Sequence, residues 1–350
     1  MSWHDFSRPV TLPSGRDPLA THRVVALDTC RWPNRVAVRL ALGANRIRGH
    51  EVEAPVLPNA IAIANGKGGV GKTSLSANLA GLAAHNGWQV LLVDIDPQGN
   101  LSSDLGYGDD PGYDGGQALL HAVEEGVGVA PLREVRPGLD VVTGGDATDL
   151  LEDRVRRQLY GGDTNALYSL YHALAPVAGR YNLIVVDCPP NMGALVDLAL
   201  SAVSYLVIPT KGDAASLNGL TRAAARFVNT RRTTNPQLAL LGVCLFGFGS
   251  QDTKLVAKAR GQLEEALEGI APVFETFVRH ARKAPDDMRE MGLLAHEYLE
   301  RAQGAPKWYE NRDAVQFSTA AAGVASDYQN LATEILGAFA ARQNAVTAAA

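Results

Sequence analysis

Residues 66–73 read GKGGVGKT, which satisfies the pattern G-x-x-x-x-G-K-[ST] of a phosphate-binding loop. An apolar run at residues 61–64 precedes the loop, and a stretch rich in alanine and leucine at residues 74–86 follows it. The loop therefore stands between a predicted strand and a predicted helix, as the pattern requires. Its glycines let backbone N–H groups converge on phosphate oxygens at the positive end of the helix dipole. This stretch predicts a site for a nucleoside triphosphate in an α/β fold.

Within the loop, the side chains have roles that are distinct from those of the backbone. Lys72 would bring positive charge to the β- and γ-phosphates, and the Thr73 hydroxyl would be a ligand for Mg²⁺. A second lysine, Lys67, follows the first glycine, where a general phosphate-binding loop does not need one. The candidate nucleotide-binding residues are Gly68, Gly69, Val70, Gly71, Lys72, Thr73 and Ser74.

Beyond the loop, apolar runs of strand length alternate with stretches of helical character. Near-continuous apolar strands between helices predict a parallel sheet that is buried on both faces. We therefore expect an α/β fold with a doubly wound, mostly parallel sheet flanked by helices, whose ligand site lies at the carboxyl ends of the strands. The predicted strands are residues 61–64, 90–93, 139–142, 183–186, 205–208 and 240–245, and predicted helices include residues 194–202 and 217–229.

The chain of 350 residues divides unequally. Residues 1–58 contain repeated prolines and one stretch with alternating apolar residues, 35–42, which with residues 43–49 predicts a small β-rich extension with a hairpin. Residues 59–342 form the predicted nucleotide-binding domain, and residues 343–350 are expected to be a disordered tail. Three cysteines and a start without signal-peptide character favour a reducing, cytoplasmic location.

Aspartates follow two of the predicted strands. Residues 93–100 read VDIDPQGN, and residues 183–190 read LIVVDCPP. Asp94 and Asp96 are two residues apart on an extended segment, so at most one faces the phosphates while the other braces the loop. Asp187 ends an apolar strand, which is the position of a carboxylate that holds Mg²⁺ in phosphate-loop proteins.

Together these motifs resemble the MinD/ParA family of ATPases, which share a deviant Walker A loop of the form KGGVGKTS. Residues 94–100 are similar to the switch I segment of the ParA branch, and residues 187–193 to its switch II segment. The resemblance covers about residues 60–340. It implies an ATP-dependent homodimer in which Lys67 reaches the partner's phosphates.

The resemblance also assigns roles around the nucleotide. It implies that Asp96 orients or activates the attacking water, with Asp94 in support, and that Lys67, Lys72 and Asp96 are the catalytic residues. Thr73, Asp96 and Asp187 are the expected Mg²⁺ site, and Pro209, after the strand at 205–208, is the expected contact for adenine.

The net charge of −5 does not argue against nucleic acid once its distribution is considered. Residues 61–220 carry 9 basic and 18 acidic side chains, whereas both flanking segments carry a small basic surplus, and residues 220–251 contain no acid at all. Non-specific DNA binding needs phosphate contacts rather than base-reading geometry. A solvated helix with unpaired arginines is the alternative interpretation. The candidate DNA-binding residues are Arg222, Arg226, Arg231, Arg232, Lys254 and Lys258.

We therefore expect a ParA-like, cytoplasmic and nucleoid-associated ATPase that uses ATP and Mg²⁺. Weak, partner-stimulated hydrolysis would control dimerisation and non-specific DNA binding, with a ParB-like or other cargo adaptor, in plasmid or chromosome partition. One alternative is a positioning ATPase for a protein cargo, or a MinD-like regulator with the same switch. Another is a metabolic enzyme such as an amidotransferase-linked synthetase. The chain end has a single cation among residues 335–343, which disfavours membrane attachment.

Overall fold

The computed structural model describes residues 54–212, 214–267, 269–306 and 315–349. The predicted hairpin at residues 35–49 lies outside these ranges. Every helix in the described residues is too short or too polar to span a bilayer.

A single sheet of eight strands runs through the described part of the chain, in the order β3-β4-β2-β5-β1-β6-β7-β8. Neighbouring strands are parallel, except that β3 pairs with β4 in the antiparallel sense. The predicted doubly wound, mostly parallel fold is confirmed. The strands are β1 (Leu57–Ile63), β2 (Val90–Asp94), β3 (Leu132–Arg136), β4 (Leu139–Val142), β5 (Leu183–Asp187), β6 (Val203–Lys211), β7 (Ala239–Phe248) and β8 (Val273–Arg279).

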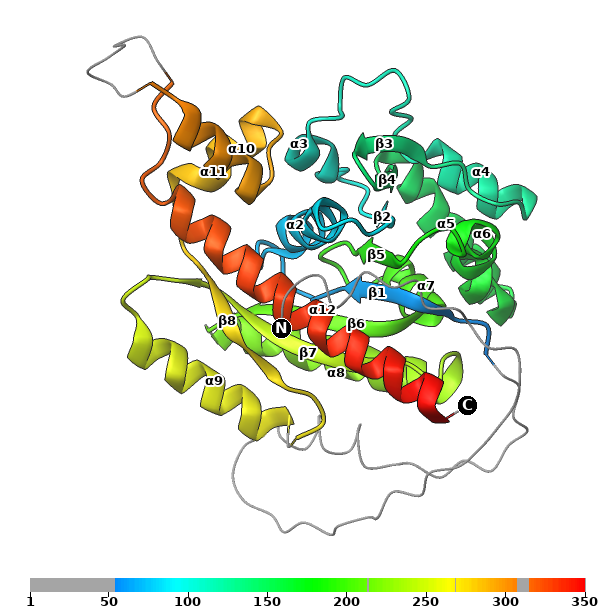
Figure 1. The fold of residues 1–350 in the computed structure, drawn as a ribbon. Coiled ribbons are helices and arrows are strands. Elements are labelled where there is room, and N and C mark those ends of the chain that lie inside the picture. The colour runs from blue at the N-terminus through cyan, green and yellow to red at the C-terminus, as the bar shows by residue number, and fades with distance from the viewer. Residues whose placement is uncertain (1–53, 213, 268, 307–314, 350) are drawn as a thin grey trace.

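Helices cover both faces of this sheet (Figure 1). In β1, Ala60 and Ala62 face one layer while Ile61 and Ile63 face the other, so both faces of the strand are apolar. The first layer contains α4 (Gln117–Glu125), α5 (Asp146–Tyr160), the short 3₁₀ helix η2 (Thr164–Tyr168), α6 (Ser169–Ala178), α7 (Ala194–Ala202), α8 (Ala214–Thr233) and α9 (Thr253–Leu267). The second contains α2 (Lys72–His85), α3 (Leu101–Leu105), α10 (Lys283–Met291), α11 (Ala295–Gly304) and α12 (Ala321–Ala349).

The end of the chain differs from the sequence-based expectation. Residues 343–349, expected to be a disordered tail, form the last two turns of α12, which crosses the sheet and packs on β7, β8 and α2 (Figure 1). Alanine has the highest helix propensity, so the alanine-rich end extends a helix that is already anchored. Phe339 of α12 is buried, and the Gln343 side chain donates a hydrogen bond to the Pro58 carbonyl of β1.

Two further boundaries differ in detail. β1 begins at Leu57, two residues before the expected start of the domain. β3, at the edge of the sheet, is a strand that the sequence did not indicate, because its residues LREVR carry charges rather than an apolar run. Charged residues suit an edge strand, since one side of such a strand has no neighbour.

Candidate nucleotide site

The phosphate-binding loop joins β1 to α2 at the carboxyl end of the central strands. Gly69 and Gly71 have φ values of +68° and +87°, which lie in the left-handed region that favours glycine. Gly71 is the N-cap of α2, where no side chain accepts from the first turn, and that turn contains no acidic residue. The first N–H groups of a helix have no partner within it. The start of α2 is therefore suited to bind an anion.

Lys72, the first residue of α2, is buried and directed back across the loop. Its ammonium donates to the Lys67 carbonyl, with 3.2 Å between Nζ and O. Burial lowers the pKa of Lys72, although Asp187, Cys188 and Asp96 each oppose that shift by attraction. An arriving phosphate would add negative charge to this site and favour the charged ammonium.

The Asn65 side chain holds the start of the loop through two hydrogen bonds. Its side-chain oxygen accepts from the Lys67 N–H at 3.0 Å, and its Nδ2 donates to the Pro209 carbonyl at 2.7 Å. Lys67 is half-buried at this position. The contact with Pro209 therefore ties the loop to the end of β6.

Two of the predicted aspartates stand side by side at adjacent strand ends. Asp94 of β2 is in register with Asp187 of β5, and both are fully buried. Burial raises the pKa of both carboxyls, to about 7 for Asp187, and the nearby Asp187 charge raises that of Asp94 further. One oxygen of each, Oδ2, is buried without a hydrogen-bond partner in the described structure. Such a pair of buried carboxylates is suited to a nearby cation.

The remaining oxygen of Asp187 is held by the first turns of α2. Ser76 Oγ donates to Asp187 Oδ1 at 2.8 Å, and a hydrogen bond from the Thr73 hydroxyl helps to lower the pKa of Asp187. Thr73 and Asp187, two of the expected Mg²⁺ ligands, are thus in contact. The described residues contain no ready cluster of three metal-binding side chains.

Asp96 lies two residues past the end of β2 and is buried. Its Oδ1 accepts from the Gln98 N–H at 3.0 Å, while Asp94 Oδ1 accepts from the Asp96 N–H at 2.9 Å. Asp94 therefore braces the backbone that carries Asp96. Gly144 makes room for this arrangement, because a Cβ there would lie 2.5 Å from Asp94 Cγ.

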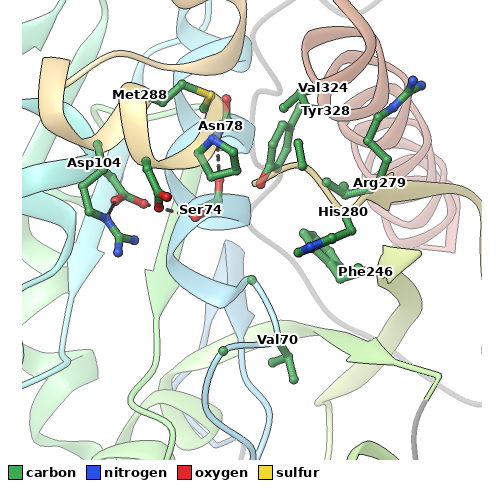
Figure 2. Close-up of a pocket in the computed structure, with 18 of the residues that line it drawn as sticks. Val70, Ser74, Asn78, Asp104, Phe246, Arg279, His280, Met288, Val324 and Tyr328 are labelled. Atoms are coloured by element: carbon green, nitrogen blue, oxygen red, sulfur yellow. Dashed lines mark hydrogen bonds and ion pairs between the residues drawn. The ribbon is translucent and has the colours of Figure 1, made fainter. Parts of the chain in front are cut away.

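A cavity of about 250 Å³ continues from the loop, between α2, the ends of β7 and β8, and helices α3, α10 and α12. Gly71 and Ser74 line it at the start of α2. Figure 2 shows Ser74 together with Met288 of α10 and Tyr328 of α12, which also line the cavity. Phe246, Arg279 and His280 are further lining residues. The cavity therefore combines apolar side chains with a few polar groups next to a phosphate-binding loop, as ligand sites commonly do.

Ser74 connects the walls of this cavity (Figure 2). Its hydroxyl donates to Asp104 Oδ2 at 3.2 Å, and a hydrogen bond links Ser74 to the buried Tyr328 hydroxyl. Arg289 of α10 pairs with the other oxygen of Asp104, with 2.7 Å between Nε and Oδ1. Helices α2, α3, α10 and α12 are thereby joined at one wall.

Pro209 is buried in β6 and is not among the residues that line the cavity. Lys211, two residues further along β6, does line it. Sequence reasoning also missed Asp104, Met288, Val324 and Tyr328. Helical spacing alone marks Met288, Val324 and Tyr328 as part of a core, and only the packing of α10 against α3 and of α12 against α2 turns them toward a site.

The six candidate DNA-binding cations differ in their surroundings. Arg222, Arg231, Arg232, Lys254 and Lys258 are exposed on α8 and α9. Arg226 forms an ion pair with Asp197 of α7 and donates to the Met192 carbonyl. The stretch at residues 220–251 has no acidic residue of its own, but Arg226 within it pairs with Asp197 from an earlier helix. Arg226 is thus half-buried and engaged within the protein.

The fold and the site define a nucleotide-binding protein with a deviant Walker A loop. A family model described as an AAA domain matches residues 58–240. The chromosome partitioning protein ParA of Myxococcus xanthus is 33% identical over 222 residues, which are 61% of this chain and 74% of that protein. The chromosome-partitioning ATPase Soj of Thermus thermophilus is 32% identical over 266 residues, or 70% of this chain and 97% of that one. The chain belongs to the ParA family of partition ATPases.

A solved structure supports the same fold. The ATP complex of a McdA variant from Cyanothece has a TM-score of 0.62 and 19% identity, and the match covers 81% of this chain and 97% of that one.

Proposed function

We propose that this protein is a partition ATPase that binds ATP with Mg²⁺, forms a dimer in that state and binds DNA without sequence preference. Slow hydrolysis of ATP, stimulated by a ParB-like or other cargo adaptor, would release the protein from DNA. The protein would act in the cytoplasm, at the nucleoid. The observation that most strongly supports this proposal is that Lys72, Asp187 and Asp96 lie close together at the start of α2, where no side chain caps the helix.

We infer one orientation for the nucleotide at this site. The triphosphate would lie over residues 68–73 and the start of α2, with the Lys72 ammonium moving from the Lys67 carbonyl to the phosphates. The base would then enter the cavity beside Phe246, with Ser74 between the two parts. Mg²⁺ would neutralise charge on the phosphates, held by Thr73 and, directly or through water, by Asp187. The unpartnered Asp187 Oδ2 supports this assignment.

Hydrolysis at this site is a matter of positioning. The Asp96 carboxylate stands at the end of a backbone braced by Asp94, where it would orient a water toward the terminal phosphate. Lys67, which is half-buried at the mouth of the loop, would complete the site of a second copy. Dimerisation would then depend on the nucleotide, since the phosphates supply the charge that Lys67 binds.

DNA binding is assigned to the exposed cations of α8 and α9. Arg222 is near the phosphate-binding loop, whereas Arg231 and Arg232 are nine and ten residues further along α8, about 14 Å away at 1.5 Å per residue. A dimer would present two such sets, which compensates for the overall negative charge. Contacts with phosphates alone suffice for such binding.

The assignment of the site is tested by ATP binding and turnover. We expect the wild type to hydrolyse ATP slowly with Mg²⁺, and Lys72→Ala to lose both ATP affinity and hydrolysis, because the buried cation is then absent. Arg180→Ala removes an exposed cation before β5 and serves as the control. Binding of a fluorescent ATP analogue and release of phosphate are the measurements. Full ATP affinity in Lys72→Ala would contradict the assignment.

A further inference from the structure

Arg226 of α8 contacts the segment that follows Asp187. Its guanidinium donates to the Met192 carbonyl and forms an ion pair with Asp197, in the first turn of α7. Met192 belongs to residues 187–193, the switch II segment, and α7 begins directly after it. One side chain of α8 therefore holds both the end of switch II and the start of the next helix.

The same helix packs against the phosphate-binding loop without spare room. A Cβ on Gly219 of α8 would lie 2.6 Å from Asn65 Oδ1 and 3.2 Å from Lys67 Cβ. A Cβ on Gly66 would lie 3.2 Å from Met192 Cγ and 3.4 Å from Arg222 Cβ. The loop, switch II and α8 thus meet at one place, and displacement of one requires the others to respond.

The opposite side of the switch II end is fixed as well. Glu152 of α5 is buried, and its Oε1 accepts from the Ala194 N–H at 3.2 Å and from Arg156 at 2.7 Å. The start of α7 is therefore held by α5, while Met192 is held by α8. A rearrangement of residues 188–193 must carry α8 with it or break the contacts of Arg226.

Charge makes the link between Arg226 and Asp197 costly to break. The Asp197 side chain is only 19% exposed, and its Oδ1 is buried without a hydrogen-bond partner among the described residues. Burial raises the pKa of Asp197, and Arg226 opposes that shift. A partly buried carboxylate that lost this partner would be left uncompensated.

We propose that Arg226 is a positioning residue that couples the nucleotide-dependent state of switch II to α8, so that the exposed cations of α8 meet DNA phosphates in only one nucleotide state. The inference rests on the proposed function. It differs from that function in giving Arg226 a role inside the protein, where the sequence suggested a contact with DNA. Such a coupling requires that the two ends share an element with two arrangements.

Asp197→Asn tests the coupling most sharply, because it removes the ion pair and keeps the cation. Arg226→Met removes the ion pair and the cation together. Arg226→Lys keeps a cation at this position without the two-pronged geometry of a guanidinium. Arg231→Met removes an exposed cation of the same helix and serves as a control. For each full-length variant we would measure the affinity for random duplex DNA with Mg-ATP and with Mg-ADP. The kcat and KM of ATP hydrolysis and the unfolding temperature complete the set.

We expect Asp197→Asn and Arg226→Met to reduce the ratio of ATP-state to ADP-state DNA affinity at least about fivefold. Both should change kcat while KM stays within about twofold, and Arg226→Lys should recover part of the ratio. Arg231→Met should weaken DNA binding in Mg-ATP, because it removes one of the cations that meet DNA in that state, and it gives the loss expected from a phosphate contact alone. If Arg226→Met fails to fold, Asp197→Asn and Arg226→Lys decide the question.

Two results would overturn the coupling. The first is a wild-type ratio and kcat in Asp197→Asn, which would make Arg226 at most a phosphate contact. The second is a lowered unfolding temperature with ratio and kcat unchanged, which would make the pair merely structural. Absence of ATP-dependent DNA binding in the wild type is a separate outcome, since it overturns the proposed function itself.

Discussion

Gly71 sets where α2 begins, and with it the position of Lys72. Its φ of +87° and its approach to Phe246 leave no space for a side chain, since a Cβ would lie 2.5 Å from the ring. Gly69 has a similar φ of +68°, but a Cβ there would have no neighbour within 4 Å. Substitution of either glycine would therefore strain the backbone, but only a side chain at residue 71 would also clash with a neighbour, the Phe246 ring.

We predict that Gly71→Ala destabilises the nucleotide-free protein more than Gly69→Ala does, by about 1–3 kcal/mol in the free energy of unfolding. The reason is that only the first forces Phe246 out of its place in the core. Chemical denaturation of both variants measures the difference. Equal losses would mean that φ alone determines the requirement for glycine at residue 71.

At the level of single residues, the sequence predicts local chemistry and misses partners. The loop at residues 66–73 was recognisable because its function depends on its own backbone. The role of Arg226 was not, because Asp197 lies 29 residues earlier and reaches it only after α7 and α8 pack together. Tyr328 shows the same limit, since nothing near it in the chain indicates Ser74.

At the level of elements, α2 and α11 meet at a pair of histidines. The rings of His85, which ends α2, and His296, near the start of α11, have centroids 4.9 Å apart. His296 Nδ1 is buried without a hydrogen-bond partner in the described residues. Burial lowers the pKa of His296 below 6.5, and repulsion from His85 and Arg136 adds to this, while Glu297 and Glu300 oppose it.

This packing predicts a pH-dependent stability. Because the folded pKa lies below the unfolded one, neutral His296 contributes stability that is present above about pH 6.5 and is lost as the pH falls through the folded pKa. We expect His296→Gln to lose less of its unfolding temperature than the wild type between about pH 7.5 and 5.5. His121→Gln, at an exposed position of α4, is the control. An identical pH dependence in His296→Gln and the wild type would refute the assignment.

Elements of the buried sheet were predictable, and those at its margins were not. The strand at residues 139–142 and the helix at 194–202 agree with β4 and α7 at both ends. A strand that is buried on both faces must be apolar throughout, which makes it visible in the sequence. The charged β3 had no such pattern. The alanine-rich end of α12 has no apolar pattern that separates it from a frayed tail, and it is helical because it extends a helix that is already anchored upstream.

At the level of the whole molecule, the nucleotide site is assembled from both ends of the described chain. The loop at residues 66–73 and switch I come early, the wall formed by residues 279–289 comes late, and Tyr328 lies on the last helix. The opposite layer carries α8, which touches the same loop through Gly219. The bound nucleotide would thus contact one layer directly and the other through the loop and switch II.

We propose that ATP at this site switches DNA binding on and that hydrolysis switches it off. The most direct measurement is the affinity and lifetime of the complex with random duplex DNA in Mg-ATP, compared for the wild type, Lys72→Ala and Asp96→Ala. We predict that Lys72→Ala fails to bind, and that Asp96→Ala binds like the wild type but remains bound after the wild type has hydrolysed its ATP and dissociated. Wild-type DNA binding by Lys72→Ala, or release by Asp96→Ala at the wild-type rate, would contradict this account.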